Sequence, residues 1–279
     1  MLIYDAANCR KGKGTDFAID RVARFVRRET CNYLSKAYYL KADISGFFMN
    51  INRYILLNMV RDVIWNKYEG IYKSELDYLV RVICLSDVTR NCIHISPIHE
   101  WDYLPERKTL FGKTTGLPIG NICSQLFANL YLNNFDHLIK SRHKLYSRYV
   151  DDIIIVDTDL AKLQKTLSII ERYLPKLNLC INHNKTIITE VKYGINYLGV
   201  IIRPYYKCLS KRRIKRLYNS SNCFNDVDGA YKSCASRQGM LKRYKGYSLM
   251  RRWYWSFPAH VRDYLKIQSG FDFVVFDRL

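Results

Sequence analysis

Three aspartates at the ends of strand-like apolar runs constrain the fold more than any other feature of this chain. Asp43 follows the run YYLKA, and Asp151 and Asp152 lie between the runs RYV and IIIV. Acids among so many apolar neighbours cost free energy unless solvent or cations receive them. An isolated Asp-Asp turn is usually only a solvated turn. The repetition at Asp43, however, predicts two strand ends that share one sheet edge.

Three converging carboxylates repel one another, and Mg²⁺, a hard cation that prefers oxygen ligands, relieves that repulsion. Two metal ions about 3.5–4 Å apart can clamp the attacking and leaving oxygens of an in-line phosphoryl displacement. The pattern therefore predicts a site for two Mg²⁺ ions that are bound by Asp43, Asp151 and Asp152.

The charge balance favours a polyanionic partner. The 279 residues include 45 Lys and Arg against 25 Asp and Glu, which gives a net charge of +20. Such an excess attracts nucleic acid and releases its counterions on binding. Between Arg203 and Arg252, 14 basic residues stand beside only two acids and are mixed with aromatic residues. This composition is typical of a groove that follows a nucleic-acid backbone and stacks its bases.

The cysteines and the hydropathy pattern favour a cytoplasmic protein. The nine cysteines are scattered and form no CxxC pair, which argues against a zinc knuckle or a disulfide framework. Reduced thiols in a cytoplasm are the simplest interpretation. We find no signal-peptide pattern and no apolar run of membrane-spanning length.

The order of the expected elements predicts an α+β fold. Helical spacing at 17–28 precedes a strand at 38–44 and a helix-like stretch at 46–65, and residues 86–116 look rich in loops. From Gly120 the pattern is helical, with Ile122, Leu126 and Leu130 near one face. A hairpin around the acidic pair, a helix at 159–174 and strands at 179–189 and 195–202 follow. We expect an antiparallel sheet with helices packed on one face over residues 1–204, and a basic, helical region over residues 205–279.

Five motifs resemble, in the same order, those of reverse transcriptases, which are RNA-directed DNA polymerases. They are LKADISGFF (40–48), GLPIGNICSQ (116–125), RYVDD (148–152), NHNKT (182–186) and YLG (197–199). Upstream, CRKGKGTDFAID (9–20) is similar to the fingers segment of bacterial reverse transcriptases. The resemblance implies a right-hand polymerase palm with short fingers and a small helical thumb. Few residues precede CRKGKG, so either the fingers are trimmed or the true start lies upstream.

The resemblance also implies roles for individual residues. Metal would be bound by Asp43, Asp151 and Asp152 together with the main-chain carbonyl of Ile44. The nucleotide would be contacted by Arg10, Lys13, Phe48, Ile119, Gly120, Gln125 and Lys185, and the primer by Tyr197, Leu198 and Gly199. Phe48 matches the aromatic gate against a ribose 2′-hydroxyl, and a core aromatic beside Phe47 is the alternative. Alternatively, Lys185 is simply an exposed lysine on a strand. The basic loop at 10–14 could likewise be an ordinary turn.

The segment IGxxxSQ at 119–125 departs from most reverse transcriptases, which have Gln and Pro at positions 119 and 125. It is similar to the enzymes of diversity-generating retroelements, which copy a template-repeat RNA with frequent errors at adenines. An apolar Ile119 removes a polar contact near the nucleotide, so discrimination between nucleotides is expected to fall. The implied partners are an RNA template, a DNA or RNA primer, dNTPs and a small basic accessory protein.

Three other interpretations compete with this one. The nearest is a reverse transcriptase of a retron or a group II intron. A second is a non-catalytic RNA-binding module that keeps the palm as a scaffold, which three intact aspartates disfavour. A protein-interaction adaptor explains the charge but not the ordered motifs.

Overall fold

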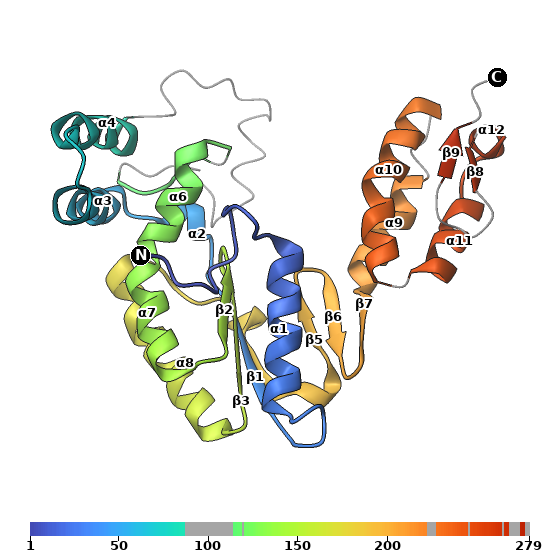
Figure 1. Ribbon diagram of the computed structural model, residues 1–279, viewed down its shortest axis with the longest axis horizontal. Helices are drawn as coiled ribbons and strands as arrows, with labels where there is room; N and C mark the ends of the chain where they lie inside the picture. Colours follow the sequence, from blue (N-terminus) through green and yellow to red (C-terminus); the bar gives the residue numbers. More distant parts are fainter. Residues whose placement is uncertain are drawn as a thin grey trace. The chain divides into compact units, whose positions relative to one another are not determined.

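A computed structural model describes residues 1–86, 114–118, 120–221, 227–244, 246–263, 265–267 and 274–276 (Figure 1). The chain forms two compact units, Met1–Glu190 and Val191–Leu279. The domain boundary expected after residue 204 remains a prediction. In the structure, the strands Ile195–Tyr197 and Val200–Arg203 group with the residues that follow them.

A four-stranded antiparallel sheet is the centre of the first unit. Its strands are β1 (Tyr38–Asp43), β2 (Tyr146–Tyr149), β3 (Asp152–Asp157) and β4 (Ile187–Glu190), and they lie in the order β2-β3-β1-β4. The β-branched run Ile153–Val156 explains the central place of β3, because such side chains pack well in a pleated sheet that is buried on both faces. The expected hairpin around the acidic pair is the β2–β3 hairpin.

Helices cover both faces of this sheet. Ile153 and Ile155 of β3 belong to a core cluster that also includes residues of α7 (Asn133–Arg142) and α8 (Leu160–Tyr173). Ile154 and Val156 point the other way and are equally buried, on the side where α1 (Thr15–Glu29) contacts β2 and β3. Figure 1 shows α1 on one side of the strands and α7 and α8 on the other.

The expected α+β fold, an antiparallel sheet with packed helices, is present in the structure, and its helix arrangement needs one correction. Helices on a single face were expected, and α1 adds a second helical layer. Helix α1 packs on the second face because it has an apolar side that must be buried against another apolar surface. That side consists of residues at helical spacing, which are Ala18, Ile19, Val22, Phe25 and Val26.

The stretch expected to be one helix at 46–65 is two helices. Asn52 separates α2 (Phe47–Asn50) from α3 (Arg53–Lys67), and its side chain accepts hydrogen bonds from the amides of Tyr54 and Ile55 as an N-cap. Helix α4 (Lys73–Leu85) packs against α3. Most of the loop-rich segment expected at 86–116 lies outside the described residues.

Helix α6 (Ile122–Tyr131) was expected, but a different face of it is buried. Ile122 and Leu126 are 91% and 53% exposed, whereas Phe127, Ala128 and Tyr131 are buried in the core. The spacing of apolar residues indicated a helix correctly. It did not identify the buried face, because apolar residues stand on more than one side of this helix.

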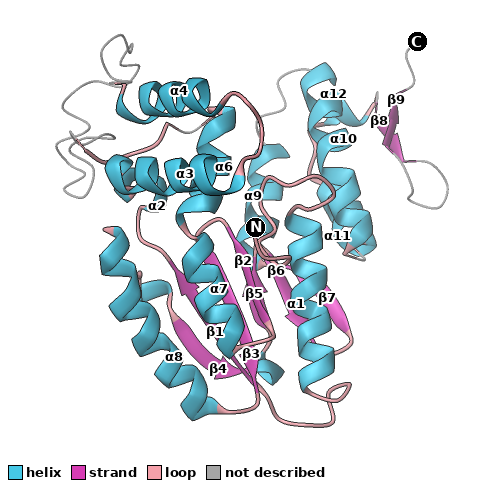
Figure 2. Cartoon of the chain, turned by 60° about the vertical axis from the view of Figure 1, so that its left-hand side comes forward, coloured by secondary structure: helices cyan, strands magenta, loops and turns pink. Residues whose placement is uncertain are grey.

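The second unit contains a small antiparallel sheet and several helices (Figure 2). Strands β5 (Ile195–Tyr197), β6 (Val200–Arg203) and β7 (Tyr206–Leu209) lie in that order. They are followed by the basic helix α9 (Lys211–Ser221) and by α10 (Val227–Arg243), α11 (Tyr247–Trp255), α12 (Ala259–Arg262), and the hairpin of β8 (Leu265–Ile267) and β9 (Val274–Phe276). Within the described parts of the chain, no helix is both long and apolar enough to cross a bilayer.

His143 makes the stability of the first unit depend on pH. Its Nδ1 lies 2.9 Å from Asp157 Oδ2 and its Nε2 lies 2.6 Å from the Thr166 hydroxyl, in a buried position. A neutral ring with its proton on Nδ1 can donate to Asp157, and the single proton of the Thr166 hydroxyl is shared between Nε2 and the Lys162 carbonyl, which lies 2.9 Å away. Burial, and then the positive charge of Lys162, lower the pKa of His143, although Asp157 opposes them.

We predict that the free energy of unfolding decreases as the pH falls below about 6.5. The unfolded chain then binds a proton at this histidine that the folded chain does not bind, so acid favours unfolding. Urea unfolding at pH 7.5 and 5.5 measures the effect, with His143→Gln as the comparison. An equally steep acid dependence in His143→Gln would assign the effect to other groups.

Candidate active site

The three aspartates lie at one end of the β1–β3 pair. Asp43 and Asp152 are directly opposite each other in the antiparallel register. The next residue, Ile44, donates its amide to the main-chain carbonyl of Asp151 over 3.3 Å. The backbone therefore brings residue 43 beside residues 151 and 152, although more than a hundred residues separate them along the chain.

Burial and mutual repulsion make the negative charge of this cluster costly. Burial, followed by the charges of Asp152 and Asp43, raises the pKa of Asp151 to about 6. Burial likewise raises the pKa of Asp152. Lys185 Nζ lies 3.0 Å from Asp43 Oδ2, and Lys41 Nζ lies 3.7 Å from Asp152 Oδ1. The acids thus require positive charge, and two lysines supply part of it.

The donor set suits a hard cation, although the side chains do not form a finished metal cage. Among the residues that the structure describes, no three His, Cys, Asp or Glu side chains are grouped so that they could hold a metal ion. Asp43 and Asp152 are instead paired with lysines. Carboxylate oxygens are nevertheless the ligands that Mg²⁺ prefers. Here they lie at one strand end, and the two lysines neutralise only part of their negative charge. The residues therefore fit the metal by donor type and by backbone position.

The turn that carries the acidic pair is strained and firmly held. Tyr149 pairs with Asp152, so Val150 and Asp151 form a two-residue loop. Val150 has a φ of 57°, which is unusual for a β-branched residue and costs about 1–3 kcal/mol. Its amide donates to Asn8 Oδ1 over 3.2 Å, and its carbonyl accepts from Arg148 Nη1 over 2.8 Å.

Arg148 is the residue that the sequence analysis missed. It is fully buried and makes a two-point ion pair with the equally buried Asp136, with Nε and Nη2 at 2.7 and 2.6 Å from the carboxylate oxygens. The Tyr146 hydroxyl also donates to Asp136, and Arg148 Nη2 lies 3.4 Å from Asn129 Oδ1. The sequence contained one sign of this role, which is an arginine in a strand that is expected to be buried. A buried guanidinium requires an ionic or hydrogen-bonding partner.

The basic N-terminal loop is used partly for internal contacts. Arg10 Nη1 donates to the main-chain carbonyls of Ile3 and Ala6. Lys13 donates to the carbonyl of Tyr4, and its ammonium lies over the rings of Tyr4 and Phe17. Both residues therefore have structural partners here, and their expected contacts to a nucleotide remain a prediction.

Four further residues expected to contact the nucleotide lie in the same unit as the aspartates. Phe48 is half-buried against the core, and its carbonyl accepts from the amide of Leu117, the second residue of the GLPIG segment. Gly120 is exposed, with a φ of 99°, and Gln125 is half-buried on α6. Lys185 is 64% exposed and pairs with Asp43. Ile119 lies outside the described residues.

The residues expected to contact a primer belong to the second unit. Tyr197 is buried at the end of β5 and pairs with Val200. Leu198 and Gly199 form the two-residue turn between β5 and β6, both with positive φ, as a type I′ hairpin turn requires. The stretch expected to be one strand at 195–202 is therefore a hairpin. Its contact with a primer remains a prediction.

We predict that Arg148→Met lowers the free energy of unfolding by about 3–5 kcal/mol, because it leaves Asp136 buried without its cation. Adding Asp136→Asn removes the orphaned charge and should recover part of the loss. Urea unfolding measures both changes. A loss below about 1 kcal/mol in Arg148→Met, within the range of exposed ion pairs, would contradict this role.

Comparisons with known proteins agree with this architecture. Residues 3–202 match the reverse transcriptase (RNA-dependent DNA polymerase) family. Among curated proteins, no sequence matches the chain. Apo telomerase from Candida tropicalis is a similar solved structure, with a TM-score of 0.52 at 14% identity over 87% of this chain and 41% of that one.

Two further telomerase structures from Candida tropicalis are similar. The enzyme truncated from its C-terminal domain has a TM-score of 0.51 at 15% identity over 68% of this chain and 39% of that one. The enzyme in complex with a TWJ fragment of telomeric RNA has a TM-score of 0.51 at 14% identity over 89% and 47%. The chain thus spans less than half the length of these structures, and likeness at this identity shows the fold alone. On the match over residues 3–202, the chain belongs to the reverse transcriptase family.

Proposed function

We propose that this chain is an active RNA-directed DNA polymerase whose catalytic residues are Asp43, Asp151 and Asp152. The observation that carries the proposal is the register of β1 and β3, in which Asp43 lies opposite Asp152 while Ile44 is hydrogen-bonded to Asp151. Membership of the reverse transcriptase family supports it. The substrates would be an RNA template, a DNA or RNA primer and dNTPs.

In this proposal the three carboxylates and the Ile44 carbonyl hold two Mg²⁺ ions. When bound, the ions supply charge neutralisation at the attacking hydroxyl and at the departing pyrophosphate. The residues of the chain hold the acidic pair in place through the Arg148 and Asn8 contacts to Val150. The rigid turn limits how far the carboxylates can separate, which preorganises the site.

Lys185 would have a second role once a cation neutralises Asp43. Its side chain is 64% exposed, so its ammonium can leave the carboxylate and contact the nucleotide phosphates. Lys41 is only 20% exposed and would stay beside Asp152. Phe48, Gly120 and Gln125 would border the nucleotide, and the turn at Leu198 and Gly199 would contact the primer.

We predict that replacing both Asp151 and Asp152 by alanine lowers the rate of primer extension on RNA on the order of a thousandfold or more. Losing metal ions that stabilise the transition state by several kcal/mol has an effect of this size. The matched control removes two exposed acids, Asp62 and Glu69, and should extend at the wild-type rate. A wild type that binds RNA but never extends a primer would favour the non-catalytic binding module.

The finer function that we propose is the copying of template-repeat RNA into adenine-mutagenised cDNA in a diversity-generating retroelement. The segment IGxxxSQ at 119–125 supports this role over that of a retron or group II intron enzyme. A small basic accessory protein would be a partner, and the cytoplasm would be the compartment. With a net charge of +20, the chain would need an apolar or acidic patch to receive a basic partner.

We predict that Ile119→Gln lowers the error frequency at template adenines by about two- to tenfold, because an amide restores one hydrogen bond of ordinary strength near the nucleotide. Sequencing the cDNA made with the accessory protein present measures the change. Ile122→Gln, at a 91% exposed position of the same segment, is the matched control and should leave the error spectrum unchanged. An unchanged adenine error rate in Ile119→Gln would remove the basis for this role.

A further inference from the structure

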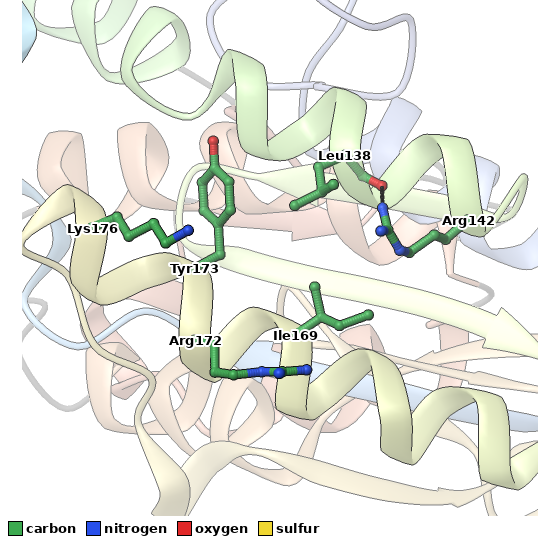
Figure 3. Close-up of a pocket in the computed structure, with 6 residues that line it drawn as sticks. All are labelled: Leu138, Arg142, Ile169, Arg172, Tyr173 and Lys176. Atoms are coloured by element: carbon green, nitrogen blue, oxygen red, sulfur yellow. Dashed lines mark hydrogen bonds between the residues drawn. The ribbon is translucent and has the colours of Figure 1, made fainter.

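A pocket of about 390 Å³ lies between α7 and α8, on the outer side of the helical layer (Figure 3). Leu138, Ile169 and Tyr173 line it with half-buried apolar surface. Three exposed cations surround that surface, and they are Arg142, Arg172 and Lys176. None of these residues belongs to the strands or the turn that carry the three aspartates.

Within the residues that the structure describes, no acid forms an ion pair with any of the three cations of the pocket. Arg142 Nη1 donates to the Leu138 carbonyl over 3.0 Å, and Arg172 Nε donates to the Ser168 carbonyl over 3.2 Å, so both guanidinium groups keep further donors. Across the described part of the chain, no Asp or Glu lies within ion-pair distance of Arg142, Arg172 or Lys176. Like charges around one hollow attract an anion that can contact all of them.

The nearest acids on the same two helices, and at their ends, already have other partners. Asp136 pairs with Arg148, Asp157 pairs with Lys162, and Glu171 lies 3.7 Å from His183. In this conformation these acids therefore do not balance the positive charge around the pocket. An anion from solution can supply that balance.

The apolar surface between the cations suits a flat ring. The Tyr173 ring packs against Phe135, with ring centroids 5.6 Å apart, so its orientation is fixed by the core. Leu138 and Ile169 extend the surface across the gap between the two helices (Figure 3). A ligand with a phosphate beside a planar base fits both properties of the pocket, whereas a simple anion uses only the charge.

We propose that this pocket binds one nucleotide unit of a single-stranded RNA. The phosphate would contact Arg142, Arg172 and Lys176, and the base would pack on Tyr173, Leu138 and Ile169. The inference goes beyond the proposed polymerase function, because it gives the chain a second place to hold RNA, away from the aspartates. Such a contact would keep a long template attached while its copied part passes through the active site.

The test uses the full chain and a single-stranded RNA that contains 4-thiouridine, with excess primer–template duplex present to fill the polymerase site. Cross-linking followed by peptide mapping should mark peptides of α7 and α8. Reversing all three pocket charges (Arg142→Glu, Arg172→Glu, Lys176→Glu) should abolish these cross-links. The slope of log affinity against log salt should also become shallower by about 0.7, because the contact to one phosphate of a single strand is lost.

A matched control variant reverses three exposed cations of the same unit outside the pocket. Its substitutions are Arg28→Glu, Lys144→Glu and Lys165→Glu. This control should keep the cross-links in α7 and α8. Primer extension on a short primer–template should be unchanged in both variants, so failure of the pocket proposal and failure of the polymerase proposal are separate results.

The role of the base is tested with two unlabelled competitors of the 4-thiouridine RNA, an RNA and an abasic oligomer of equal length. The unlabelled RNA should displace the cross-links to α7 and α8 at a several-fold lower concentration than the abasic oligomer, and Tyr173→Leu should lose that difference while Tyr173→Phe keeps it. Free nucleoside monophosphate that displaces the RNA at equal concentration would point to a small-molecule site and overturn the proposal. Equal competition by polyglutamate would also overturn it, because the surface would then respond to charge alone.

Discussion

The buried ion pair between Arg148 and Asp136 is the interaction on which the candidate site depends. Neither side chain is exposed, so the pair exists only because each charge finds several hydrogen bonds within the core. The remaining donor of Arg148 binds the carbonyl of Val150 and holds a backbone conformation that valine disfavours. Asp151 and Asp152 come directly after Val150 in the chain. The buried Arg148 therefore sets their position through its contact with Val150.

A second constraint is the charge of the aspartate cluster. Burial raises the pKa of Asp151 and of Asp152, and lysines at positions 41 and 185 offset the accumulated negative charge. Without cations, the negative charges of such a site repel one another at a cost in free energy. A bound cation relieves that repulsion, and for that reason the site can bind cations strongly. The crowded negative charge of these residues lowers the stability of the folded chain, and it also makes them suitable for metal-assisted phosphoryl transfer.

Positive charge has two separate uses in the first unit. Some cations make internal contacts. Arg10 and Lys13, for example, donate hydrogen bonds to main-chain carbonyls. Others, such as Arg172 and Lys176, face a pocket whose described lining residues include no acid. The excess of lysine and arginine in the composition cannot separate these uses, because composition contains no information about which acids lie nearby in space.

Local sequence patterns were enough to predict the type and order of most elements around the site, including the strand before Asp43 and the hairpin at Asp151 and Asp152. Those features are local, since they depend on apolar spacing and on the residues that end a strand. Four other features became known from the three-dimensional packing: Asp43 lies opposite Asp152, Arg148 is paired with Asp136, Ile122 and Leu126 are exposed, and α1 covers the second face of the sheet. These outcomes depend on contacts between distant residues, because a periodic pattern shows that a face is buried but not what covers it.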